Sequence, residues 1–149
     1  MDLEAISNGL AARFAPGTIG TPTGASAMRA SYGQAPNSIP TTPCIVVFPK
    51  DGDLVYGSGQ VKGQHRLDVC FYLSKSPGDI ARVEKQRQKW LGLLLAATHG
   101  AMKLGLASAV DKAIPASWEF TELPYAGELY DGIIVHVTVY ATDNVSLVP

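Results

Sequence analysis

The first pattern in the chain is an amphipathic helix near the N-terminus. Its apolar residues recur three or four positions apart and share one helical face: Leu3, Ile6, Leu10 and Phe14. This spacing predicts a helix over residues 2–14. Ala15-Pro16-Gly17 ends it, because proline cannot continue a helix and glycine accepts the closing turn.

A second helix is predicted over residues 80–97, with Gly100 closing it. Its expected inward residues follow the same spacing: Ile80, Val83, Trp90, Leu91, Leu94 and Ala97. Ser76 is the expected cap and Pro77 fits the first helical position, while Asp79 suits the positive end of the helix dipole.

Strand patterns occupy the stretch between these helices. Residues 43–49 form an almost continuous apolar run between prolines, which predicts a strand covered on both faces. Asp51-Gly52 then predicts a tight turn over residues 50–53, and residues 54–56 and 61–73 continue the sheet. In the last of these runs alternate apolar residues share one face: Leu67, Val69, Phe71 and Leu73.

Two more strands are predicted near the C-terminus, over residues 117–123 and 133–142, with a loop over 124–132. Trp118 and Phe120 share one side of the first. The second has one aliphatic row, which we expect to pack under the helices: Ile133, Val135, Val137 and Val139. The opposite row is mixed and suits an interface or a wetted sheet face: Ile134, His136, Thr138 and Tyr140.

The remaining segments are less regular. Residues 17–37 are rich in small and polar residues and predict a flexible loop, with a short strand near residues 28–32. Residues 101–113 form a weaker segment compatible with a short helix that Pro115 limits. Strands grouped together with helices set apart predict an α+β domain: a mostly antiparallel sheet with helices on one face.

Composition agrees with one domain over residues 1–149. The 46% apolar content supports a core, and the 17% charged content is below the usual value of about 25%. The net charge of −1 gives no overall basic field of the kind that nucleic-acid binders carry. Acidic residues at the start do not suit a signal peptide, and no apolar run approaches membrane-span length. We therefore expect a soluble protein made in a cytoplasm.

Cys44 and Cys70 both lie in apolar strand patterns, which favours buried free thiols; a disulfide between them remains an alternative. The three histidines are scattered, and none has the spacing of a zinc site. No G-x-S-x-G elbow is present, and triads are recognised by geometry rather than by sequence. We expect no catalytic, metal-binding or cofactor-binding residues.

Two glycine-rich stretches lack the features of phosphate sites. In residues 57–63 the third glycine is one place late and a strand follows, so a twisted hairpin or bulge is expected. Residues 17–24 lack the Gly-Lys-Ser/Thr ending of a phosphate loop.

Basic residues make the middle helix locally positive: Arg82, Lys85, Arg87 and Lys89. Arg82, Lys85 and Lys89 share the side opposite the apolar stripe. A solvated face is the first interpretation, and contact with an acidic partner or with passing nucleic acid is the alternative.

Together these segments resemble the tail terminator proteins of long-tailed bacteriophages. The resemblance rests on the opening helix, S-I-P-T-T-P-C-I-V-V-F-P (residues 38–49), the strand over 65–73, the helix over 80–97 and the ending Y-D-G-I-I-V-H-V-T-V-Y-A-T (residues 130–142). It is a likeness of order, length and texture over most of the chain.

The resemblance implies a structural protein of the virion neck, assembled in the host cytoplasm. Copies of the chain would form a ring, expected to be a hexamer, between the tail-tube protein and a head-side connector or stopper protein. DNA would pass through the channel without sequence recognition, and no cofactor, catalytic residue or membrane is implied. The His136 row would then face a neighbouring subunit or the channel. Two alternatives stay open: another head-closure protein, or a small enzyme or ligand-binding domain with a pocket near His136 and Asp68.

Overall fold

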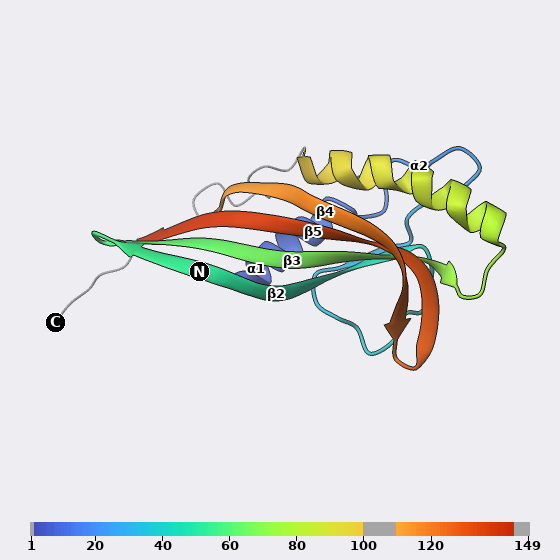
Figure 1. The fold of residues 1–149 in the computed structure, drawn as a ribbon, viewed down its shortest axis with the longest axis horizontal. Helices are drawn as coiled ribbons and strands as arrows, with labels where there is room; N and C mark the ends of the chain where they lie inside the picture. Colours follow the sequence, from blue (N-terminus) through green and yellow to red (C-terminus); the bar gives the residue numbers. More distant parts are fainter. Residues whose placement is uncertain (1, 100–109, 145–149) are drawn as a thin grey trace.

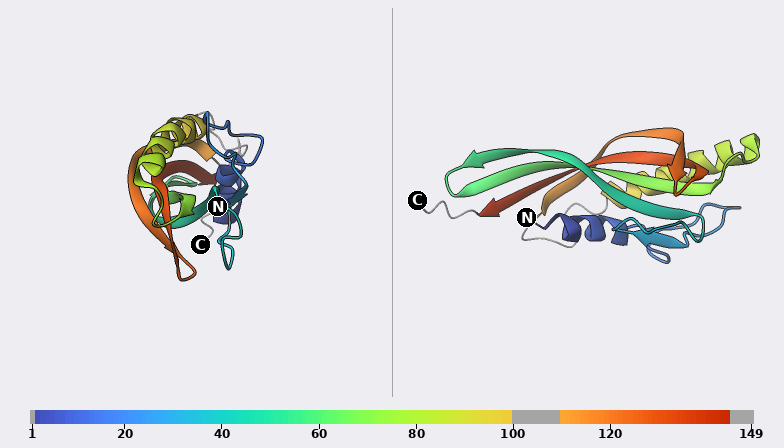
Figure 2. Two further views of the ribbon diagram at one scale, coloured as in Figure 1. Left: turned by 90° about the vertical axis from the view of Figure 1, so that its right-hand side faces the viewer. Right: turned by 90° about the horizontal axis from the view of Figure 1, so that it is seen from below.

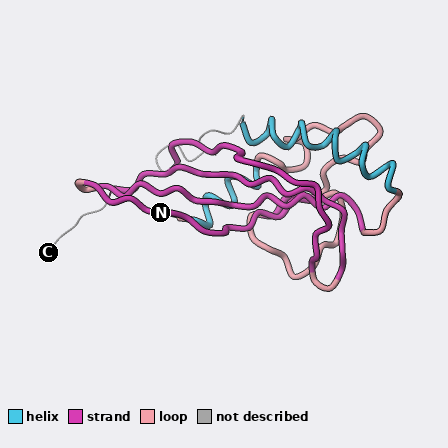
Figure 3. The backbone as a smooth tube through the Cα atoms, viewed as in Figure 1, coloured by secondary structure: helices cyan, strands magenta, loops and turns pink. Residues whose placement is uncertain are grey.

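The computed structural model describes residues 2–99 and 110–144. In chain order the elements are α1 (Leu3–Ala12), β1 (Ala30–Tyr32), β2 (Cys44–Gly57), β3 (Gln60–Lys75), α2 (Ile80–His99), β4 (Val110–Tyr125) and β5 (Glu128–Asn144). The fold is α+β, with two helices contacting a five-stranded mixed sheet that is mostly antiparallel, as the sequence predicted. Figure 3 shows how far the strands extend compared with the two helices.

The strands follow the order β1-β2-β3-β5-β4. Among the described strands, only the short β1 runs parallel to its neighbour, and the other pairs are antiparallel. Register places Asp68 of β3 opposite His136 of β5, and His136 opposite Ser117 of β4. Three strands therefore bring their central residues together on one face, because side chains paired across a sheet point the same way.

One end of the sheet projects beyond both helices (Figures 1 and 2). We call this projection the arm; it consists of residues 51–57 of β2 and 60–66 of β3, and the end of β5 pairs along it. β1 pairs with β2 only at residues 44–46, so β1 does not cover the outer edge of the arm. Leu54, Val55 and Tyr56 are exposed there, at 53%, 67% and 67% of their surfaces.

The turn predicted at residues 50–53 is wrong, because these residues continue β2 into the arm. The chain continues as strand through Asp51 and Gly52, with a register shift between Pro49 and Asp51. It turns instead at Ser58-Gly59, where the φ of Gly59 is +71°. Pro49 is tolerated here because proline, which has no backbone N–H to donate to a neighbouring strand, is accepted in edge strands and next to bulges. Residues 57–63 thus form the hairpin that was predicted for them.

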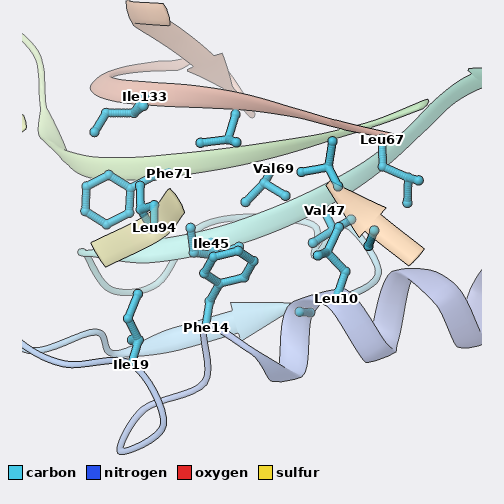
Figure 4. Close-up of a cluster of buried hydrophobic side chains, with 14 of the residues drawn as sticks. Leu10, Phe14, Ile19, Ile45, Val47, Leu67, Val69, Phe71, Leu94 and Ile133 are labelled. Atoms are coloured by element: carbon cyan, nitrogen blue, oxygen red, sulfur yellow. The ribbon is translucent and has the colours of Figure 1, made fainter. Parts of the chain in front are cut away.

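The main core lies between one face of the sheet and both helices. Figure 4 shows Leu10 and Phe14 pointing toward Ile45 and Val47 of the sheet. The aliphatic row predicted to pack under the helices is buried, with at most 1% of any of its residues exposed: Ile133, Val135, Val137 and Val139. The alternate residues of β3 belong to the same core: Leu67, Val69, Phe71 and Leu73. Both face assignments are confirmed.

The start of α2 differs in detail from the prediction. Asp79 caps the helix, since its Oδ1 accepts from the backbone N–H of Arg82 at 3.2 Å. Ser76 instead donates its hydroxyl to Glu122 at 3.3 Å, and Pro77 precedes the helix. Ile80, predicted to face inward, is 80% exposed, because the first turn of α2 extends past the sheet (Figures 1 and 2).

Two other boundaries were predicted wrongly. Residues 124–132 form a tight hairpin instead of a loop, with Ala126 and Gly127 at φ values of +50° and +83°. Positive φ at both central residues matches the twist of paired strands. Residues 110–113 belong to β4, whereas the rest of the weak segment lies outside the described residues.

The loop over residues 17–37 contributes to the core. Ile19 and Met28 are buried, and Lys89 of α2 donates to the carbonyl of Thr23 at 3.1 Å. The short strand expected in this loop is β1. The flexibility predicted for the segment stays a prediction.

A second cluster of buried side chains lies on the opposite face of the sheet, near β1. It contains Cys44, Val46, Cys70, Tyr72, Leu123 and Tyr130. The Tyr125 hydroxyl donates to the carbonyl of Pro36. This hydrogen bond joins the loop between β1 and β2 to the β4–β5 hairpin. Among the described residues, no helix is both long and apolar enough to cross a membrane.

Both cysteines are free and buried in this second cluster, as favoured from the sequence. Burial raises the pKa of each thiol to about 12, and the nearby charge of Asp68 adds to the effect at Cys70. A thiol in the unfolded chain has a pKa of about 8.5, so burial disfavours the reactive thiolate across the neutral and mildly alkaline range.

We therefore expect a thiol-specific reagent to label neither cysteine in the folded protein. Both should react once the chain is denatured. Raising the pH from 7 to 9 should accelerate labelling of the denatured chain and leave the folded chain almost unlabelled. Absorbance of the released chromophore measures this directly. Rapid labelling of either thiol in the folded protein would contradict the burial of that side chain.

Candidate functional site

The most conspicuous polar group on the sheet lies on the face away from the helices. We call Asp68, Glu119 and His136 the His136 cluster; they come from β3, β4 and β5, respectively. The three strands alternate, so the apolar side chains between these residues point into the main core on the other face. The cluster is therefore a consequence of strand register.

The imidazole of His136 lies between two carboxylates. Its Nδ1 is 2.6 Å from Oδ1 of Asp68, and its Nε2 is 3.7 Å from Oε1 of Glu119. The side chains of His136 and Asp68 are 31% and 21% exposed, while that of Glu119 is 55% exposed. The His136 row is thus half-covered, and His136 itself is outside the main core.

A second ion-pair group continues from the cluster toward the arm. Arg66 of β3 contacts Asp51 through Nε at 2.5 Å and Asp53 through Nη1 at 3.0 Å. Hydrogen bonds to Asp51 and then to Asp53 raise the pKa of the Arg66 guanidinium. These exposed pairs link the two strands of the arm, although exposed ion pairs each contribute only about 0–1 kcal/mol.

A shallow hollow lies between these two groups. It is lined by residues that include Lys50, Asp68, Ser117, His136 and Thr138. An Asp–His pair is the arrangement that orients a general base, because the carboxylate fixes the imidazole tautomer. Here the other ring nitrogen faces Glu119, so the imidazole bridges two acids and links β3, β5 and β4.

The cluster supplies carboxylates and one imidazole, which are the donor types that metals use. Within residues 2–99 and 110–144, however, no three His, Cys, Asp or Glu side chains are arranged to hold a metal ion. The chemistry that the geometry supports is cross-strand pairing and contact with a polar or charged surface.

His136 and Asp68, expected from the sequence as a possible pocket, are in direct contact in the structure. The sequence did not predict Glu119 or Arg66 as their neighbours, because no local motif connects four residues from separate parts of the sheet. The only available signal was the polar alternation of the strands.

The basic residues of α2 separate into different environments. Arg87 is only 8% exposed; its guanidinium donates to the carbonyl of Thr121 at 3.1 Å and pairs with Asp131 at 3.6 Å. Lys89 reaches back to the loop at Thr23. Arg82 and Lys85 are exposed. The three residues predicted to share a solvated side, Arg82, Lys85 and Lys89, are therefore all exposed, and Arg87 is the buried exception.

No protein-family model matches this sequence, and a comparison with curated proteins finds no match.

Proposed function

We propose that this chain is a structural subunit of a bacteriophage neck, a tail terminator that forms a ring closing the tail tube. The observation that carries the proposal is the arm: a projecting piece of sheet with adjacent exposed apolar side chains and an uncovered edge. Exposed apolar patches and unpaired strand edges favour association with another chain.

The His136 face supports the same proposal. It offers paired charges and half-covered side chains across three strands, which is typical of a polar interface. Low charge density along the whole chain is also compatible with surface that becomes covered in an assembly. The resemblance in order and length of the elements supplies the identity of that assembly.

In this proposal one face of the ring binds the tail-tube protein and the other binds a head-side connector or stopper. DNA passes through the channel without recognition of its sequence. A head-closure protein is the nearest alternative, since it would use the same kind of ring.

The Asp68–His136 pair favours a second candidate, a small enzyme or ligand-binding domain. Its geometry is that of an oriented imidazole. That candidate requires a small molecule bound in the hollow beside His136, and a metabolite retained through purification would support it.

The experiment is to determine the mass of the purified protein in solution and then to mix it with purified tail tubes. We expect a closed oligomer, with six copies as the expected number, bound at one end of each tube and preventing further elongation. Electron microscopy and native mass spectrometry provide the measurements. Binding to isolated connector rings but not to tubes would favour the head-closure alternative. A chain that stays monomeric at every concentration and binds neither would refute the proposal.

A further inference from the structure

One face of the arm tip combines apolar surface with a positive charge. Residues 54–64 contain Lys62 as their single Lys, Arg, Asp or Glu. Lys62 pairs in register with Val55, so the two side chains share one face of the arm. Leu54 and Tyr56 alternate with Val55 and lie on the other face. The face with Val55 therefore carries the ammonium group of Lys62, while Asp143 of β5, opposite Val61, lies on the face of Leu54 and Tyr56.

A pocket of complementary character lies at the start of α2. Pro77, Ile80 and Val83 form apolar parts of its lining, and Ile80 is 80% exposed. Its charged lining residues are Glu84, Arg87, Glu122 and Asp131. Three carboxylates against one guanidinium give this lining a formal charge of −2. We call this site the acidic pocket.

The carboxylates of the acidic pocket differ in their partners. Arg87 holds Asp131 at 3.6 Å and Glu84 at 3.4 Å, and the Asp131 side chain is only 10% exposed. Glu122 lies at the rim and accepts a hydroxyl from Ser76 at 3.3 Å. A further cation placed beside Glu122 would be stabilised by this excess negative charge.

The two features lie at opposite ends of the molecule. Figure 1 shows the arm tip at the left and the first turn of α2 at the right, and the right-hand view of Figure 2 agrees. The tip of one chain cannot reach the pocket of the same chain. Contact between them requires a second copy.

We propose that the arm tip of one copy seats in the acidic pocket of the next. Lys62 is directed to Glu122, and the apolar side chains of the tip pack on Pro77 and Ile80. This deepens the proposed function and rests on it, since the ring is the assembly in which the contact would be made. A head-to-tail contact joins two different surfaces, and it closes a ring when the rotation between copies permits.

Charge complementarity favours the arm tip, rather than a nucleic acid, as the group that binds in the acidic pocket. A nucleic-acid backbone would be repelled by the carboxylates of the acidic pocket. On one face of the arm tip, Lys62 and Val55 supply a positive charge and apolar surface that match the carboxylates and apolar lining of the acidic pocket.

Opposite charge reversals at the two ends test the contact. Lys62→Glu and Glu122→Lys should each raise the concentration needed for assembly at least about tenfold, because each places like charges together. An equimolar mixture of the two variants should assemble again, since every junction then unites opposite charges. Analytical ultracentrifugation measures assembly, and circular dichroism verifies the fold. Lys85→Glu, the same change at an exposed residue of α2 outside the acidic pocket, serves as the control and should assemble like the wild type.

Other outcomes separate the two proposals. If both variants assemble like the wild type, the arm contact is wrong while a wild-type ring still supports the proposed function. If each variant loses assembly and the mixture does not recover it, Lys62 and Glu122 do not meet and the contact is again wrong. If the wild type itself forms no oligomer, alone or on tail tubes, the proposed function fails and the contact fails with it.

Discussion

Replacing Trp90 by alanine should lower the free energy of unfolding by about 3–5 kcal/mol, the usual cost of removing a large buried aromatic side chain. Trp90 lies on the sheet-facing side of α2 and is 0% exposed. Its ring packs on that of Phe71, with centroids 5.0 Å apart. The substitution would open a cavity between helix and sheet, because the neighbouring strands cannot collapse into it without losing their pairing.

Trp118→Ala is the matched control. This tryptophan is 47% exposed on β4, so the same truncation should cost about 1 kcal/mol or less. Urea denaturation followed by fluorescence gives both values. Measurement at two protein concentrations separates any contribution from assembly. Equal losses at the two sites would contradict the position of Trp90 in the core.

Gly132→Ala should be the second strongly destabilising change. A Cβ at this position would lie 2.2 Å from the carbonyl oxygen of Phe71 and 2.6 Å from Cδ1 of Leu123. Leucine could adopt another rotamer, but the Phe71 carbonyl is part of the β3 backbone. The strands would have to separate locally, and we expect a loss of about 3 kcal/mol, the upper part of the range for overpacking.

Gly92→Ala provides a control of opposite sign. Gly92 lies within α2, and an added Cβ meets nothing within 4 Å. Alanine favours helix over glycine by about 0.5–1 kcal/mol, so this variant should be more stable than the wild type. Thermal denaturation of the two variants makes the comparison. A neutral Gly132→Ala would mean that the β3–β5 pairing is looser than the register indicates.

Much of the fold was predictable because local periodicity and burial agree. The aliphatic row of β5 and the alternate residues of β3 identify the main core face, and the spacing of Ile6 and Leu10 places α1 against it. Errors occurred where pairing outweighed local turn propensity. Asp51-Gly52 favours a turn by itself. Gly52 nevertheless pairs with His65, because the sixteen-residue β3 offers a pairing partner to β2 along the whole length of β2.

The second hairpin shows the same limit. Tyr125-Ala126-Gly127-Glu128 contains none of the usual Asn-Gly or Asp-Gly pairs, and Ala126 takes a positive φ that an alanine seldom adopts. The long strands on either side fix the turn and offset its local cost. Sequence alone could not reveal that offset, since it depends on pairing across the sheet.

The sequence by itself determined the α+β class, both helices and the sides of β3 and β5 that enter the core, because these depend on spacing within a single element. Only the tertiary structure decided that His136 meets Asp68 and Glu119, that Arg87 is buried and that a long arm projects past the helices. Those features depend on the register between strands and on where each helix ends over the sheet. Register is a property of pairs of segments far apart in the chain, and no single segment encodes it.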